Sequence, residues 1–230
     1  MTSHAGNRRP TACMGVIALL VGTASAWAGG APGTAPVATV DHSAHAGHTM
    51  PAAGEMPGDS LYQLPVHFTT ASGDHLMLQQ YRGEPVVVTM FYGTCKAACP
   101  MLMRAMSETA ANLPASARGK VHFLMVTLDP ERDSVEALRS LKQEYKLDTS
   151  NIEVARTDDD GVRLLSAALG IRYRKLPDGN FSHSSILTAL DGTGVPRART
   201  EKLVVADPEF VAAVSGLVGA KRPSQSATRP

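Results

Sequence analysis

The most constraining feature of the sequence is an apolar, β-branched run that ends almost directly on a pair of cysteines. Residues 85–92 read PVVVTMFY, a run without polar alternation that predicts a strand buried on both faces of a sheet. Cys95 and Cys99 follow, and Pro100 suits the first turn of a helix predicted over 101–113. A strand that leads through a cysteine pair into a helix indicates an α/β fold with its sulfurs at a strand–helix junction.

The rest of the chain alternates predicted strands with predicted helices. Further strands are expected at residues 64–69, 75–78, 121–128, 152–155, 184–190 and 195–200, and further helices at residues 134–145, 161–169 and 208–219. Strands separated by helices imply parallel pairing, and a hairpin at each end supplies antiparallel edges. The sequence therefore predicts an α/β, thioredoxin-like fold over residues 60–220, with a central mixed sheet flanked by helices and an N-terminal β-hairpin extension.

The two ends of the chain have a different character from the middle. In residues 1–28, Arg8 and Arg9 precede an apolar run, and small residues follow it. This is the pattern of a cleavable signal peptide. Residues 29–59 are rich in Ala, Gly, Pro, Ser and Thr and predict a flexible linker, and residues 221–230 predict a disordered tail. We therefore expect an exported, periplasmic protein, or one anchored in the inner membrane if the first segment is not cleaved.

Charge and cysteine content limit the classes of function. With 22 basic and 21 acidic residues the chain has no strongly basic character, which argues against a nucleic-acid partner. Three cysteines are too few for a zinc site of four cysteines. Because Cys13 lies in the predicted signal peptide, the exported chain would keep one close pair, Cys95 and Cys99.

The cysteine pair is compatible with a structural disulfide, a redox pair or a metal site. The start of a helix lowers the pKa of a thiol, but the thiolate is both nucleophile and metal ligand, so this position alone does not decide. The spacing is C-x-x-x-C rather than C-x-x-C, and four helical residues rise about 6 Å with both side chains on one face. A disulfide is feasible at that separation, yet the small loop it closes would add little stability.

His183 is the candidate third metal ligand, because it follows a Pro/Gly loop at the start of a strand expected in the same sheet. Two sulfurs and one imidazole favour copper, particularly Cu(I), whereas zinc would need a fourth ligand. A lone histidine at a strand end is more often an ordinary polar residue, so this interpretation depends on the cysteines. Three other histidines beside predicted strands are interpreted as structural: His67, His75 and His122.

The predicted linker contains possible accessory copper ligands. These are His42, His45, His48 and Met50, with Met56 nearby. A His-rich tract indicates metal binding by composition only, and a solvated tail is the alternative.

Three segments together resemble the SCO/SenC family, the copper-binding thioredoxin-like proteins of cytochrome c oxidase assembly. They are residues 90–100, which hold the C-x-x-x-C-P motif, residues 126–133, which read VTLDPERD, and the pair His183-Ser184 after a polar loop. Two residues depart from the family pattern. Gly93 stands where members often have Thr, and Ser182 stands where an acidic residue commonly precedes the histidine.

The resemblance implies a copper site of Cys95, Cys99 and His183 and a reversible Cys95–Cys99 disulfide. It implies a cell-envelope metallochaperone that delivers copper to the copper-site subunit of cytochrome c oxidase, or to another periplasmic copper protein, and that needs a thiol reductant. The alternative is a thiol-disulfide oxidoreductase that reduces the cysteines of such a client. Peroxide reduction at Cys95, with Cys99 resolving a sulfenic acid, is a third hypothesis.

Overall fold

The structure is a computed structural model that describes residues 57–96, 98–147, 152–203 and 205–219. The predicted signal peptide, nearly all of the predicted linker and the C-terminal tail lie outside the described residues. The same holds for the possible accessory ligands His42, His45, His48 and Met50 and for Met56. Among the helices that the structure does describe, none is both long enough and apolar enough to cross a membrane.

A seven-stranded mixed sheet forms the centre of the described unit. Its spatial order is β2-β1-β5-β4-β3-β8-β9. The strands are β1 (His67–Thr70), β2 (His75–Met77), β3 (Val86–Phe91), β4 (His122–Thr127), β5 (Ile152–Arg156), β8 (Leu187–Leu190) and β9 (Pro196–Thr200). The three middle strands β3, β4 and β5 are parallel, and a terminal hairpin is added antiparallel on each side. The predicted mixed sheet and its N-terminal hairpin are confirmed.

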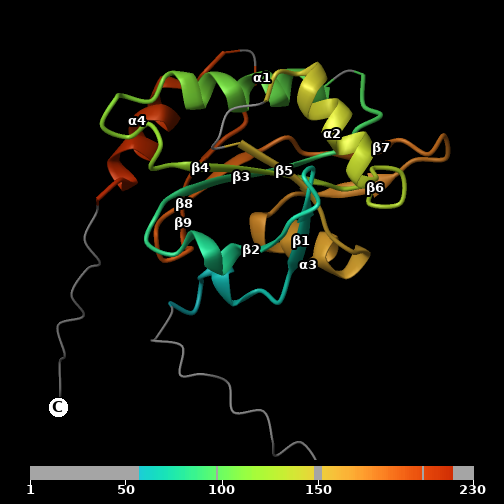
Figure 1. The fold of residues 1–230 in the computed structure, drawn as a ribbon, viewed down its shortest axis with the longest axis horizontal. Coiled ribbons are helices and arrows are strands. Elements are labelled where there is room, and N and C mark those ends of the chain that lie inside the picture. The colour runs from blue at the N-terminus through green and yellow to red at the C-terminus, as the bar shows by residue number, and fades with distance from the viewer. Residues whose placement is uncertain (1–56, 97, 148–151, 204, 220–230) are drawn as a thin grey trace, which may run out of the picture. The chain divides into compact units, whose positions relative to one another are not determined.

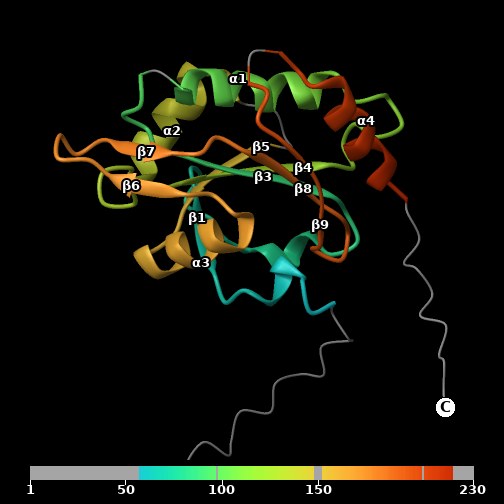
Figure 2. The same cartoon turned by 180° about the vertical axis from the view of Figure 1, so that it is seen from behind.

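Helices cover both faces of this sheet. They are α1 (Ala98–Ala111), α2 (Val135–Glu144), α3 (Asp159–Leu169) and α4 (Pro208–Leu217). Helices α1 and α2 lie on one face and α3 lies on the other, in the front view (Figure 1) and in the view from behind (Figure 2). Every residue of β3 is buried between these layers, as its continuous apolar run predicts.

Side-chain caps fix where the helices begin. Ser134 caps α2 by accepting a hydrogen bond from the backbone of Ala137, and Asp158 caps α3 by accepting one from Gly161. Gly170 ends α3 in the left-handed conformation that favours glycine.

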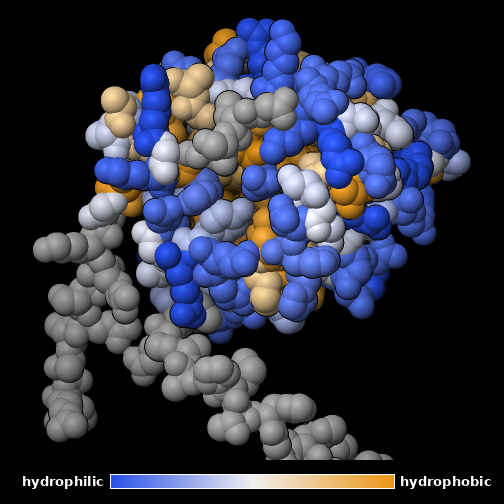
Figure 3. Space-filling model, viewed as in Figure 1, coloured by the Kyte–Doolittle hydropathy of each residue, from blue (hydrophilic) through white to orange (hydrophobic). Residues whose placement is uncertain are grey.

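The surface of the unit is mostly polar. The face in Figure 3 is largely hydrophilic, with hydrophobic side chains visible only in limited areas between polar ones. The large apolar side chains that are exposed, Met101, Leu164 and Val205, come from separate parts of the chain. The apolar residues of the fold therefore serve mainly to pack the helices on the sheet.

The structure corrects the sequence prediction around residues 173–186. The polar turn at residues 175–180 is present, but its flanks pair as a separate two-stranded sheet of β6 (Tyr173–Lys175) and β7 (Phe181–His183). The strand predicted from residue 184 begins only at Leu187. Strands of three half-exposed residues carry no hydrophobic period, which is why the pattern did not reveal them. In both views this β6–β7 hairpin extends beyond the main sheet (Figures 1 and 2).

Candidate metal centre at the cysteine pair

The two cysteines lie where β3 passes into α1. Cys95 is in the connecting loop and Cys99 is in the first turn of the helix, and both side chains are buried. The backbone N–H of Cys99 donates a hydrogen bond to Sγ of Cys95, with 3.4 Å between the two atoms. Both residues are thiols in this structure. The helix therefore holds the second cysteine and directs an N–H group at the sulfur of the first.

His183 reaches the pair from the end of β7. Its Nε2 lies 3.8 Å from Sγ of Cys99, and its Nδ1 lies 3.1 Å from the carbonyl oxygen of Ser184. A carbonyl oxygen can only accept, so Nδ1 carries the proton and Nε2 presents its lone pair towards the sulfur. The histidine comes from the separate hairpin rather than from a strand of the main sheet, which corrects the predicted location. The structure brings it into contact with Cys99.

Burial keeps these groups neutral. It raises the pKa of Cys99 to about 12, although a backbone hydrogen bond from Tyr92 opposes the rise and the Cys95 thiol adds to it. Burial lowers the pKa of His183, against a smaller opposite effect of its hydrogen bond to Ser184. At neutral pH the centre therefore holds a protonated Cys99 thiol beside a neutral imidazole, and a metal ion would displace the thiol proton.

Tyr92 contacts both His183 and Cys95, and this role was not recognised from the sequence. Its ring meets the ring of His183 edge-on, with centroids 5.6 Å apart, and packs on Phe181 with centroids 5.4 Å apart. Its hydroxyl is hydrogen-bonded to the Cys95 side chain, and burial together with that bond raises the pKa of the phenol. In the sequence Tyr92 ends an apolar run, so nothing there separates this role from core packing.

Asp133 is a buried carboxyl directly behind the cysteine loop. One of its oxygens accepts hydrogen bonds from the backbone N–H of Gly93, at 2.9 Å, and from the hydroxyl of Thr127. Burial raises the pKa of Asp133, and these two hydrogen bonds act against the rise. Ser134 caps α2, and Asp133 instead supports the loop before Cys95.

The absence of a side chain at Gly93 is explained by Asp133. A Cβ atom at position 93 would lie 2.5 Å from Oδ1 of Asp133 and 3.2 Å from its Cγ. Glycine, where family members often have Thr, therefore leaves room at this position for the buried carboxyl of Asp133.

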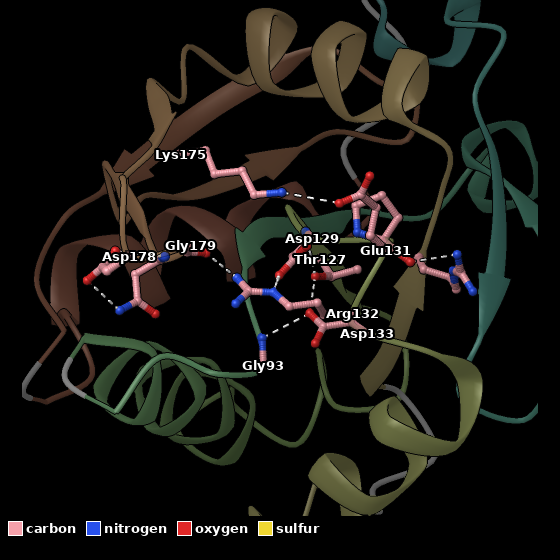
Figure 4. A network of polar contacts seen from close by, with 12 residues as sticks. Gly93, Thr127, Asp129, Glu131, Arg132, Asp133, Lys175, Asp178 and Gly179 are labelled. Atoms are coloured by element: carbon pink, nitrogen blue, oxygen red, sulfur yellow. Dashed lines mark hydrogen bonds and ion pairs between the residues drawn. The ribbon is translucent and has the colours of Figure 1, made fainter. Parts of the chain in front are cut away.

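A polar network connects the histidine hairpin with the loop after β4 (Figure 4). Arg132 donates hydrogen bonds to the carboxylate of Asp129 and to the carbonyl of Gly179, in the turn between β6 and β7. Lys175 of β6 pairs with Glu131, with 3.2 Å between the charged atoms. The hairpin that carries His183 is thus fastened to the same loop that supplies Asp133.

The donor set suits a soft metal ion, although the side chains are not closed around one position. In the described part of the chain, no three side chains among His, Cys, Asp and Glu already converge as a metal site. Cys99 and His183 are in contact, and Cys95 is joined to Cys99 through the helix N–H. Two thiols and an imidazole with a free Nε2 lone pair are ligands that copper prefers.

These features define a class of protein: a thioredoxin-like α/β fold with a cysteine pair at a strand–helix junction and a histidine against one of the sulfurs. A family model described as SCO1/SenC matches residues 55–217, which is more than half of the chain. The chain therefore belongs to the SCO1/SenC family. Comparison with curated proteins gives no match.

Solved structures with a similar fold cover most of the described unit. ScoI of Bradyrhizobium japonicum with copper bound has a TM-score of 0.56 at 19% identity, covering 67% of this chain and 96% of that one. Yeast Sco1 with copper bound has a TM-score of 0.56 at 17% identity, covering 73% and 94%. BsSco, described as a Sco-family cytochrome c oxidase assembly protein with a disulfide switch, has a TM-score of 0.58 at 18% identity, covering 70% and 95%. At these identities the likeness shows the fold.

Proposed function

We propose that this protein binds one copper ion through Cys95, Cys99 and His183. The observation that carries the proposal is the 3.8 Å approach of His183 Nε2 to Cys99 Sγ, with Nδ1 engaged by the Ser184 carbonyl. That hydrogen bond fixes the tautomer whose Nε2 can coordinate, as partners of the other ring nitrogen do in metal sites. Two sulfurs and one imidazole favour copper, and the copper-bound Sco neighbours support the same ion.

The copper is proposed to be cargo of a metallochaperone. Membership of the SCO1/SenC family and the naming of BsSco as an oxidase assembly protein support a role in cytochrome c oxidase assembly. The recipient would be the copper-site subunit of that oxidase or another periplasmic copper protein. Export rests on the signal-like residues 1–28, and His42, His45, His48 and Met50 are proposed to collect copper ahead of the folded centre.

A thiol-disulfide exchange role is the second candidate, favoured by the short link from the Cys99 N–H to the Cys95 sulfur. One thiolate would attack a client disulfide and release one client thiol. The other cysteine would then displace the second client thiol, leaving a Cys95–Cys99 disulfide and a client reduced by two electrons. A thiol reductant would restore the pair.

Anaerobic Cu(I) titration against a chromogenic Cu(I) chelator tests the copper proposal. We expect one tightly bound equivalent in the reduced full chain, weakened at least tenfold, or about 1.4 kcal/mol, by His183→Ala. His122→Ala is the matched control, because that imidazole is engaged with Glu84 and stacks on Tyr81. Unchanged affinity in His183→Ala would refute the three-ligand centre. Turnover of a disulfide substrate that survives the same substitution would favour the exchange role.

The accessory ligands need their own comparison. Replacing His42, His45 and His48 by Ala in the full chain should remove weaker equivalents and leave the tight one unchanged. Identical stoichiometry in both proteins would dismiss the collecting role of this segment.

A further inference from the structure

The edge hairpin β1–β2 brings together two histidines and a methionine that the sequence interpretation treated as structural or did not consider. In its register His67 is opposite Met77, and Thr69 is opposite His75. Alternate residues of a strand share a face, so His67, His75 and Met77 lie on the same side of the hairpin. The other side carries the buried Phe68.

The backbone pattern makes these side chains close neighbours. The N–H of Thr70 donates to the carbonyl of Asp74 at 2.9 Å, which makes the pair next to the turn a hydrogen-bonded one. Hydrogen-bonded and non-hydrogen-bonded pairs alternate, so His67–Met77 is of the second kind, in which facing side chains are closer. Their Cβ atoms are then about 5 Å apart, and the diagonal His67–His75 pair is about 7 Å apart, within reach of a shared ion.

Both imidazoles are available to a ligand. His67 and His75 are exposed, and Met77 is partly buried. Within the described residues, neither imidazole makes a hydrogen bond, an ion pair or a ring contact, unlike His122 with Glu84. Arg156 is opposite Thr69 in the strand register and so shares this face with the histidines. Its guanidinium donates a hydrogen bond to the carbonyl of Pro130 at 2.7 Å.

The chemistry of the three donors selects the ion. Imidazole suits copper and zinc, but a thioether is a soft ligand that favours Cu(I), and magnesium and calcium prefer oxygen. We propose that His67, His75 and Met77 form a second copper site, on the surface of the β1–β2 hairpin, that takes Cu(I). It shares no ligand with the cysteine centre.

The site lies at the same end of the sheet as the cysteines, the end where the parallel strands finish. Strand β1 runs antiparallel to β5, and the hydroxyl of Thr157, just after β5, donates to the carbonyl of His67 at 2.7 Å. The His67 end of the hairpin therefore lies beside the carboxyl ends of β5, β4 and β3. Three strand spacings, about 14 Å, separate β1 from β3. An exposed Cu(I) site would thus stand at the same end of the sheet as the buried centre.

Nuclear magnetic resonance of the reduced full chain during anaerobic Cu(I) titration tests this site, because Cu(I) is diamagnetic. With methyl-labelled methionine, we expect the Met77 methyl signal and the His67 and His75 ring signals to shift together after the first equivalent. The exposed Met101 methyl, two residues from Cys99, should respond to the first equivalent only. His183→Ala should leave these shifts unchanged, which separates this test from that of the cysteine centre.

Substitutions at the exposed positions complete the test. His75→Gln should abolish the Met77 shift, and Met77→Leu should weaken Cu(I) at this site at least tenfold, whereas His122→Ala should change neither. Core methionine signals report that each variant is folded. The proposal is overturned if the Met77 signal does not shift by the third equivalent, or if its shift survives His75→Gln. It is also overturned if Zn(II) shifts the imidazole signals of Met77→Leu as much as Cu(I) shifts those of the unsubstituted protein.

Discussion

Among the residues just before the C-x-x-x-C motif, Gly93 is the most tightly constrained. Its N–H binds the buried Asp133 carboxyl, and the space for a Cβ is already filled by an oxygen of that carboxyl at 2.5 Å. The carboxyl is a side-chain end and could turn away, but it is also bound to the hydroxyl of Thr127. A side chain at position 93 would therefore cost hydrogen bonds as well as space.

Gly93→Ala should lower the free energy of unfolding by about 1–3 kcal/mol, the range for overpacking a well-filled site. Chemical denaturation of the metal-free protein measures this. In an Asp133→Ala background the same substitution should cost much less, because the opposing oxygen is gone. An equal cost in both backgrounds would show that Asp133 is not the cause.

Tyr92 is expected to modify the electronic properties of a copper centre without being a ligand. Its hydroxyl is hydrogen-bonded to Cys95, and a donor at a metal-bound thiolate withdraws electron density from the sulfur. Tyr92→Phe should keep copper stoichiometry, move the thiolate-to-Cu(II) absorption band to longer wavelength and lower the copper reduction potential. Tyr173→Phe, in the neighbouring hairpin, is the matched control. If neither the band nor the potential moves, the hydroxyl has only a packing role.

Among the elements, the β6–β7 hairpin depends most on contacts outside itself. Each strand has three residues, and Arg132 and Lys175 fasten it to the loop of residues 129–133. The two links differ, because Asp129 is buried whereas both charged groups of the Lys175–Glu131 pair are largely exposed. Exposed pairs contribute little to stability.

Arg132→Gln should therefore release the hairpin more than Lys175→Met does. We expect about tenfold faster hydrogen exchange at the Ser184 amide, which bonds to Arg172 across the hairpin, since charge-assisted hydrogen bonds contribute about 1.5–3 kcal/mol. Lys175→Met should leave that rate almost unchanged. Equal effects of the two substitutions would contradict the central role of Arg132.

The turn between β8 and β9 is held by Asp191. Its carboxylate accepts from the backbone of Thr193 at 2.8 Å, the backbone of Val195 at 3.1 Å and the side chain of Arg197 at 2.6 Å. Burial would raise the pKa of Asp191, but hydrogen bonds from Thr193, Arg197 and Val195 outweigh it, and the pKa is lowered. A lowered folded-state pKa gives stability that is present above the unfolded pKa, near 3.9, and is lost as pH falls through the folded pKa.

Asp191→Asn should consequently destabilise the protein by about 1–2 kcal/mol at pH 7, and by less at pH 2, because the native carboxyl takes up its proton as the pH falls through its lowered pKa. Urea unfolding at the two pH values measures the difference. A destabilisation that is the same at both would mean that the charge of Asp191 contributes nothing.

For the molecule as a whole, sequence patterns predict what depends on neighbouring residues and fail where the cause is distant. The continuous apolar run of β3 and the existence of the helix α3 were readable locally. The contact of Gly93 with Asp133 joins residues 40 positions apart, and no pattern in either segment encodes it. His183 lies 84 positions from Cys99, and only ligand chemistry and family resemblance suggested that they would meet.

That separation has a thermodynamic consequence for the whole fold. The unfolded chain keeps the two cysteines close together, but His183 joins them only when β7 is folded against the cysteine loop. Copper should therefore bind the folded state better. At 1,000 times the dissociation constant a ligand of the folded state alone adds about 4 kcal/mol to the free energy of unfolding, and copper bound by the unfolded cysteine pair reduces this gain. For a domain of this size the full gain corresponds to a rise of about 10 °C in Tm, and the expected rise is smaller.

Thermal unfolding of the reduced protein with and without Cu(I) checks this linkage. His183→Ala should lose most of the rise in Tm, because its folded state offers copper little more than the cysteine pair that the unfolded chain also offers. His122→Ala should retain the full rise, since its imidazole pairs with Glu84 at the N-terminal end of β4, away from the cysteines. A rise as large in His183→Ala as in the unsubstituted protein would mean that copper stabilises the fold without bringing β7 and the cysteine loop together.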